Sequence, residues 1–134
     1  MPKLIVTVIL AFSVLLGVVS CSAKPAGTTE ASAVRSYADP AAKAMMQAIT
    51  DKDLAKYAQY GNAQFKAAVT QAVFDQLAAQ MAAQFGKFVS NEFLSTENQD
   101  QYIIVHYKAQ FEKGQLGLRM VFDQDHKVAG QFFE

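Results

Sequence analysis

The chain has 134 residues, the length of a single domain. Its twelve basic and twelve acidic side chains balance, and they form no basic stripe of the kind that nucleic-acid-binding proteins set against phosphates. The single cysteine excludes an intramolecular disulfide. We therefore expect one domain with its own hydrophobic core and no nucleic acid partner.

The N-terminus has the pattern of an export signal. Lys3 precedes a predominantly apolar run from Leu4 to Val19, and a charged start followed by such a run is typical of a secretory signal. The run is short for a helix that must cross about 30 Å of hydrocarbon. We therefore interpret residues 1–20 as a cleaved signal peptide rather than a membrane anchor.

The junction Val18-Val19-Ser20-Cys21 resembles the bacterial lipobox. This resemblance implies cleavage before Cys21 and attachment of lipid, including palmitate, to that residue. Each buried methylene contributes about 0.8 kcal/mol, so two or three chains anchor a protein firmly. Ser22, rather than Asp, follows the cysteine, which resembles the outer-membrane pattern of Gram-negative lipoproteins. We expect a protein anchored in the cell envelope through lipid on Cys21, on the periplasmic side of the outer membrane if the source is Gram-negative.

Residues 21–38 are expected to form a flexible tether, because small and polar residues bury too little surface to become ordered. The domain then covers residues 39–134. Asp39 and Pro40 suit the N-cap and first position of a helix. A short helix capped by Asp51 is expected next, carrying Leu54 and Tyr57, and then another helical turn near Phe65.

The clearest helix is expected to begin at Thr70 and to end near Gly86, where a glycine can adopt a left-handed conformation. Its apolar face is expected to pack on a sheet. That face consists of Phe74, Leu77, Ala78, Met81, Ala82 and Phe85.

After Gly86 the hydrophobic period changes from helical to alternating. A weak strand is predicted over Phe88–Leu94 and a strong one over Gln101–Glu112. Lys113-Gly114 turns the chain into a third strand that ends near Asp123, and Lys127–Phe133 forms the last. Helices followed by an antiparallel meander indicate an α+β domain, with N-terminal helices packed on a curved sheet.

The stretch from about Lys52 to Phe133 resembles the bacterial domain of unknown function 3887. The resemblance implies a cystatin-like cone of the nuclear transport factor 2-like superfamily, whose sheet curls around its helices. That superfamily includes ketosteroid isomerase-like enzymes, transport adaptors and non-catalytic ligand-binding modules, so the fold alone does not define a function. The matching segments are Phe65–Val69, Gly86–Phe88, Phe111–Gly114, Leu116–Asp123 and Lys127–Phe133.

The candidate pocket or interface residues lie on the predicted sheet. They are Tyr102, Ile104, His106, Lys108, Arg119, Val121 and Gln131. If they face the inside of the cone, their polar members line a pocket for an anion or a small apolar ligand. If they face outward they are solvated sheet residues, which we favour because antiparallel sheets commonly keep one wet face. In that case an apolar patch forms for a homodimer or an envelope protein partner, made of Tyr102, Ile104, Val121 and Phe133.

The sequence contains no Gly-x-Ser-x-Gly, no His-Glu-x-x-His and no phosphate-binding glycine loop. An isomerase-like reaction needs a carboxylate base opposite a hydrogen-bond donor. The candidates are Asp53 or Asp75 with Tyr57, Tyr102 or Tyr107. Both acids have ordinary explanations as helix-surface or first-turn residues.

His126 beside Asp123 and Asp125 matches no metal-binding loop. We therefore expect no metal or cofactor, and no enzyme. The expected function is that of a lipid-anchored, non-catalytic ligand-binding or protein-interaction module. A small ketosteroid isomerase-like enzyme and a structural envelope protein acting through dimerisation are the alternatives.

Overall fold

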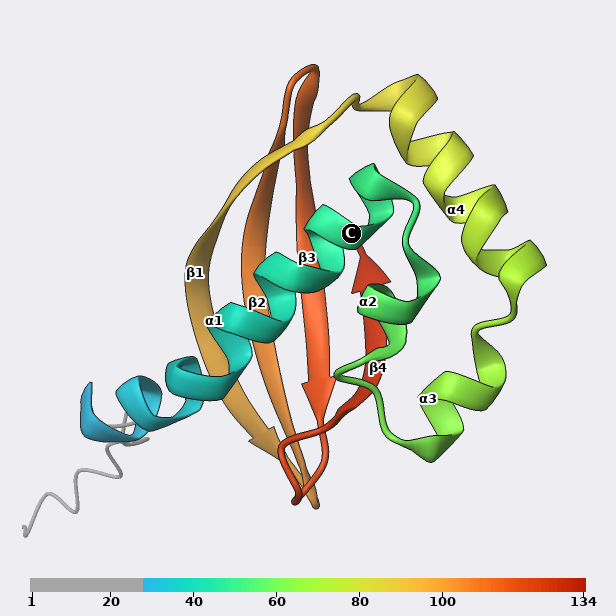
Figure 1. The fold of residues 1–134 in the computed structure, drawn as a ribbon. Helices are drawn as coiled ribbons and strands as arrows, with labels where there is room; N and C mark the ends of the chain where they lie inside the picture. The colour runs from blue at the N-terminus through green and yellow to red at the C-terminus, as the bar shows by residue number, and fades with distance from the viewer. Residues whose placement is uncertain (1–27) are drawn as a thin grey trace, which may run out of the picture.

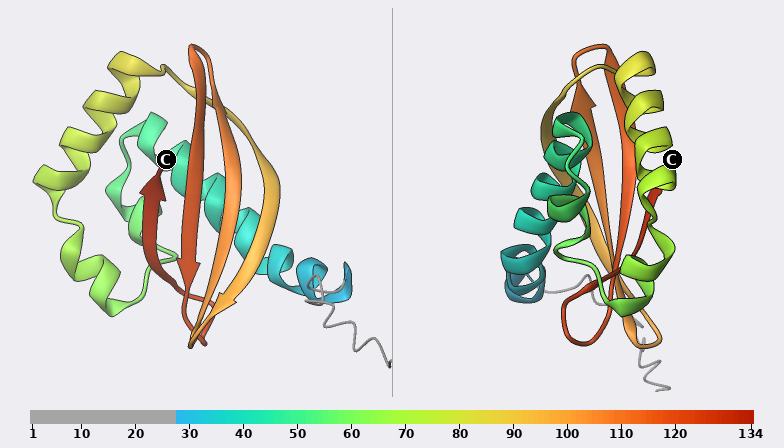
Figure 2. Two further views of the ribbon diagram at one scale, coloured as in Figure 1. Left: turned by 180° about the vertical axis from the view of Figure 1, so that it is seen from behind. Right: turned by 45° about the vertical axis from the view of Figure 1, so that its right-hand side comes forward.

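The computed structural model describes residues 28–134. Helices come first and strands follow, in one antiparallel sheet with strand order β1-β2-β3-β4. Helices gather on one face of this curved sheet, and α1 crosses that face diagonally (Figures 1 and 2). The predicted α+β class is confirmed. The elements are α1 (Thr28–Asp51), α2 (Leu54–Ala58), α3 (Ala63–Ala68), α4 (Gln71–Gln84), β1 (Phe88–Gln99), β2 (Tyr102–Phe111), β3 (Gly114–Phe122) and β4 (Val128–Phe133).

Helix α1 is longer than the sequence indicated. It begins at Thr28, so the predicted flexible tether over residues 21–38 is wrong from Thr28 onward, while residues 21–27 lie outside the described residues. Pro40 lies inside the helix rather than at its start. A proline there removes one backbone hydrogen bond. The helix continues through Pro40 because its apolar stripe is buried both before and after the proline. The stripe consists of Val34, Ala38, Ala41, Ala42, Met45, Met46, Ala48 and Ile49.

The caps of the short helices explain where the chain turns. Asp53, not the expected Asp51, caps α2, and its Oδ1 accepts a hydrogen bond from the Lys56 amide at 3.0 Å. Asn62 caps α3 in the same way, with 2.9 Å between its Oδ1 and the Phe65 amide nitrogen. Each side chain satisfies an amide that the first helical turn leaves free.

Helix α4 begins after its cap Thr70 as predicted, but it packs mainly against α1 rather than the sheet. Phe74 is fully buried and lies 5.0 Å from the ring of Tyr57. Leu77 is half-buried and Ala82 is exposed, so the apolar face is narrower than expected. At the other end, Phe85 reaches the sheet through Phe111, at 5.9 Å between ring centroids.

Bulges shape the sheet. Strand β1 runs to Gln99, beyond the predicted Leu94, and its register against β2 skips Val89 and Leu94. The pairing of β3 with β4 skips Ala129. Each extra residue bends its strand and increases the local twist. The bulges thus bring the sheet around α1. Among residues 28–134, no helix combines the length and apolar character needed to cross a membrane.

The burial of Phe74 yields a test of the fold. Replacing Phe74 with Ala should lower the free energy of unfolding by about 3–5 kcal/mol, because it leaves a cavity beneath α4. The neighbouring Val73 is 53% exposed, so Val73→Ala should change stability by less than about 0.5 kcal/mol. Denaturant melts of residues 28–134 measure both. Equal, small effects would contradict the placement of α4.

Candidate functional site

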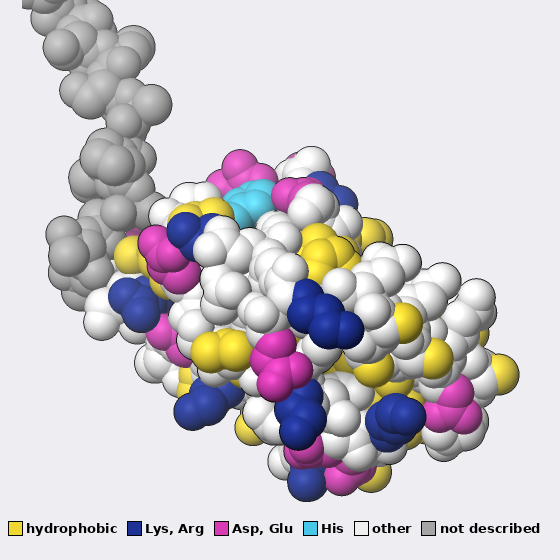
Figure 3. Space-filling view, turned by 90° about the horizontal axis from the view of Figure 1, so that it is seen from above, with side chains coloured by type: hydrophobic (Ala, Val, Ile, Leu, Met, Phe, Trp, Pro, Cys, Tyr) yellow, Lys and Arg dark blue, Asp and Glu magenta, His cyan; other side chains and the backbone are white. Residues whose placement is uncertain are grey.

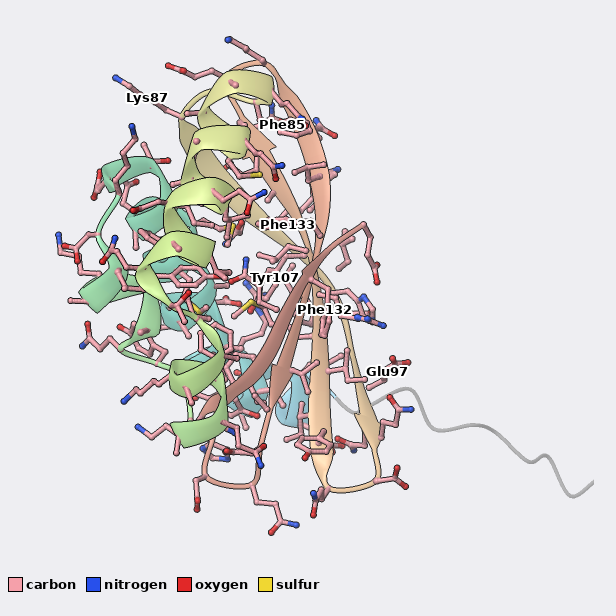
Figure 4. All side chains as sticks on the ribbon, turned by 90° about the vertical axis from the view of Figure 1, so that its right-hand side faces the viewer. Phe85, Lys87, Glu97, Tyr107, Phe132 and Phe133 are labelled. Atoms are coloured by element: carbon pink, nitrogen blue, oxygen red, sulfur yellow. The ribbon has the colours of Figure 1, made fainter. Side chains whose placement is uncertain are left out.

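Most of the predicted site residues share the sheet face that points away from the helices. Val105 and Tyr107 of β2 lie in the core, so the alternating positions of that strand face outward. Figure 4 shows Tyr107 between the sheet and the helices and Glu97 on the opposite side. The register of the strands places on this outer face Tyr102, Ile104, His106, Lys108, Arg119 and Val121.

Gln131 does not join this set, and the prediction that it does is wrong. It pairs with Met120, a core residue, and so faces the helices. The reason is the bulge at Ala129, which shifts the alternation of β4 by one residue. Both side-chain amide atoms of Gln131 are buried without a hydrogen-bond partner.

The same bulge rearranges the expected apolar patch. Phe133 pairs with Leu118 and packs against the core, whereas Phe132 faces outward and is 47% exposed. The guanidinium of Arg119 lies 4.6 Å from the centroid of the Phe132 ring. Ile104 is only 5% exposed. The apolar surface on this side is therefore smaller than the sequence indicated, and it centres on Phe132.

The polar members of the outer face are paired with acids on neighbouring strands. Lys108 contacts Glu92 at 2.7 Å, and His106 lies 3.5 Å from Glu97. Such exposed pairs contribute about 0–1 kcal/mol each and are common on solvated surfaces. Figure 3, which shows the molecule from above, has acidic and basic side chains interspersed with small hydrophobic areas on that side too. The outer face is thus an ordinary solvated surface rather than a pocket.

The space between the helices and the sheet is filled by large apolar side chains. Those that are fully buried include Tyr107, Phe74, Phe111, Phe122, Met45, Met46, Leu118 and Met120. Interiors packed in this way leave little room for a ligand. The interior itself is therefore not the binding pocket that a hollow cone would provide.

A cleft of about 270 Å³ opens instead where α1 crosses β1. We call it the α1–β1 cleft. Arg35, Asp39 and Lys43 recur at intervals of four residues, so they lie along one side of α1. Strand β1 and Tyr107 of β2 form the rest of the lining: Phe88, Val89, Ser90, Asn91, Phe93 and Tyr107. An open groove of about 580 Å³ adjoins the cleft and shares Arg35, Asp39 and Phe93 with it.

A hydrogen bond at the floor of the cleft joins helix to sheet. The Tyr107 hydroxyl donates to Oδ1 of Asp39 at 2.7 Å. The other carboxylate oxygen, Oδ2, accepts from Arg35 at 2.9–3.0 Å. Burial, reinforced by the hydrogen bond to Asp39, raises the pKa of Tyr107 well above its usual value. Asp39, expected to be a helix cap, is therefore a structural acceptor within the cleft.

Asn91 is the least satisfied group in the cleft. Its Oδ1 and Nδ2 are both buried, and neither has a hydrogen-bond partner. Asn91 pairs with the core residue Ala109, so its side chain faces the helices. Native structures leave few buried polar atoms unpaired, and each one calls for an explanation. The Asn91 amide therefore has hydrogen-bonding capacity that no residue within 28–134 meets.

Sequence reasoning missed this cleft. The spacing of Arg35, Asp39 and Lys43 was a usable signal, but it has meaning only if α1 starts before Asp39. Asn91 gave no signal, since one polar residue in a weak strand is unremarkable. The predicted lipidation residue, Cys21, lies outside the described residues.

The candidate catalytic and metal-binding groups have other roles. Asp53 caps α2, and Asp75 accepts a hydrogen bond from Gln71 on the exposed side of α4. His126 stacks on Tyr37 at 4.0 Å, and Asp123 accepts two backbone amides of the β3–β4 turn. Within residues 28–134, no three acidic, histidine or cysteine side chains gather as a metal site would require.

The raised pKa values of Tyr107 and Tyr57, both caused first by burial, predict how stability depends on pH. Above about pH 10.0, the ordinary pKa of tyrosine, the unfolded chain loses protons that the folded protein keeps. The contribution of these two tyrosines to stability should therefore be constant below that pH and fall above it. Ultraviolet titration should show these two tyrosines ionising only as the protein unfolds, and Tyr107→Phe should weaken the alkaline loss. Ionisation of all tyrosines in the folded state would contradict their burial.

The comparisons with known proteins identify a family but no function. A family model described as "Protein of unknown function (DUF3887)" matches residues 42–130. The match covers the C-terminal part of α1 from Ala42 onward, the other helices and nearly all of the sheet, including Asn91 and Tyr107 of the cleft. No curated protein and no solved structure matches the chain. Because the family model matches more than half of its length, the chain belongs to the DUF3887 family.

Proposed function

We propose that this protein is a non-catalytic, lipid-anchored ligand-binding module of the cell envelope, and that the α1–β1 cleft is its binding site. The observation that carries this proposal is the unpartnered amide of Asn91, buried in a cleft that also has apolar walls. Small-molecule sites characteristically combine apolar lining with a few placed polar groups. The cleft has both.

The hydrogen bonds of the cleft favour binding over catalysis. Both oxygens of Asp39 are engaged, one by Tyr107 and the other by Arg35. A general base must direct an accepting oxygen at the substrate proton that it removes, whereas these oxygens are directed at Tyr107 and Arg35. The Tyr107 hydroxyl also directs its proton at Asp39 rather than at a substrate. These side chains are therefore arranged to hold the cleft open, which gives the isomerase alternative less support.

The short separation between Cys21 and the start of α1 at Thr28 is compatible with a membrane anchor at that cysteine. Residues 22–27 separate that cysteine from the helix, and six residues span at most about 20 Å when fully extended. Lipid on Cys21 would hold the domain next to the bilayer, on the periplasmic side of the outer membrane in a Gram-negative cell.

The anchor is tested by Cys21→Ala. The wild type should incorporate radiolabelled palmitate and sediment with membranes, whereas the variant should remain an unlabelled precursor of higher mass. Gel mobility measures the mass of the precursor, and membrane fractionation measures attachment to the bilayer. Wild-type protein that is unlabelled and stays in the soluble fraction would exclude the anchor.

Ligand binding is tested by native mass spectrometry of protein extracted from its own envelope. We expect a retained small molecule, and we expect Asn91→Trp to abolish it because Asn91 lines the cleft and its side chain faces the helices. Ser95→Trp is the matched control, since Ser95 pairs with His106 and lies away from the cleft. Identical spectra for the three proteins would contradict the assignment of this cleft.

A second proposal concerns self-association through the outer face. It is favoured by Phe132, which presents a 47% exposed ring beside Arg119, and by the half-buried Val121 on the same face. Large aromatic residues and arginine are enriched in protein interfaces. The partner would be a second copy of this chain or another envelope protein.

Self-association predicts that Phe132→Asp abolishes any dimer without unfolding the domain. The exposed Val73 on α4 provides a control, because Val73→Asp adds the same charge far from the sheet. Sedimentation velocity at high protein concentration distinguishes the two variants. A wild-type protein that is monomeric throughout would remove this proposal and leave the cleft unaffected.

A further inference from the structure

We infer, resting on the proposed function, that the α1–β1 cleft selects a small anionic ligand that carries a carboxylate, a neighbouring amide group and a short apolar portion. An N-acylated amino acid has this chemistry. The inference draws on three independent properties of the lining: its charge, the unpaired amide of Asn91, and its apolar walls and size.

The charge of the cleft favours an anion. Its ionisable lining groups are Arg35, Lys43 and Asp39, so two positive charges and one negative leave a net charge of +1. Arg35 and Asp39 neutralise each other at 2.9 Å. Lys43 lies one helical turn beyond Asp39 and has no ion-pair partner within 4.0 Å among residues 28–134. Its ammonium group is therefore the cation available to a ligand carboxylate.

Asn91 determines which hydrogen-bonding groups the ligand must carry. A carboxamide offers two N–H donors and one carbonyl acceptor, and here both of its polar atoms are buried and unpaired. A lone carboxylate supplies acceptors only, and a lone ammonium supplies donors only. An amide group satisfies both atoms of Asn91, because it presents a donor and an acceptor together. Pairing a buried amide in this way removes the penalty that it carries in the empty cleft.

The apolar walls and the volume of the cleft determine the apolar portion and the size of the ligand. Phe88 and Phe93 line the cleft beside Tyr107, and the Phe93 ring is already covered on one side by Arg35 at 4.8 Å. The volume of about 270 Å³ corresponds to about nine water molecules at ~30 Å³ each. It lies just below the range of about 300–1,000 Å³ that drug-sized ligands occupy. The cleft thus suits a single acylated amino acid with an aliphatic side chain.

Two probes isolate the contribution of charge. N-acetyl-L-leucine and N-acetyl-L-leucinamide have nearly the same shape, but only the first is an anion. Using the full-length protein extracted in detergent, we expect isothermal titration to show the anion binding at least about tenfold more tightly. Lys43→Gln should abolish this preference. Lys66→Gln, the same change on the exposed surface of α3, is the control and should leave it intact.

Asn91→Val separates a binding role from a structural one. If Asn91 serves the ligand, the variant should lose affinity for both probes while its melting temperature stays equal or rises, because a buried unpaired amide has been removed. If Asn91 serves the fold, the variant should melt at a lower temperature. That result would overturn the role given to Asn91.

The outcomes distinguish this inference from the proposed function. Tighter binding of the anion that depends on Lys43 supports the inference. Equal binding of the two probes, lost in Asn91→Val, overturns the anion selectivity and leaves the cleft as a binding site. Absence of binding by either probe overturns the inference, while a native ligand that Asn91→Trp expels would still support the proposed function.

Discussion

The close packing of α1 across the sheet is the constraint on which the rest of the structure depends. Four alanines of α1, where the helix meets the core, are almost completely buried, so the helix backbone approaches its neighbours closely. Met45 and Met46 then fill the remaining space. This contact keeps the helix continuous through Pro40, and the sheet bends around it through the bulges of β1. Without this burial, nothing would favour a continuous helix through Pro40 or the curvature of the sheet around it.

The cleft follows from the same packing. Where α1 passes over β1 the helix presents Arg35, Asp39 and Lys43 instead of small apolar residues, and the two elements no longer close on each other. The hydrogen bond from Tyr107 to Asp39 bridges the opening. The fold therefore leaves a cleft between α1 and β1 in which the amide of Asn91 has no hydrogen-bond partner. Pre-organised, partly apolar openings of this kind are where proteins commonly bind small molecules.

The two sides of the sheet differ in how fully their polar groups are satisfied. On the outer face the acids of β1 pair with Lys108 and His106, which contact solvent. Arg119 is the exception there, because its Nε lies 3.4 Å from Glu134 but is buried and forms no hydrogen bond. On the helix side, amide groups of β1 and β4 are buried and unpaired. Unmet hydrogen-bonding capacity is the stronger indication of a ligand, because water already satisfies a charged group on an open surface.

The sequence by itself determined the order of helices and strands, the cap at Thr70, the alternation of β2 and β3, and the family. These are local properties, set by capping chemistry and by side-chain period. Tertiary structure alone decided three others: the extension of α1 through Pro40, the reversal of Gln131, Phe132 and Phe133 at the Ala129 bulge, and the position of Asn91 under α1. Each depends on how distant segments share one core. Burial energy there outweighs a lost hydrogen bond, and a single unpaired residue changes which side chains face inward.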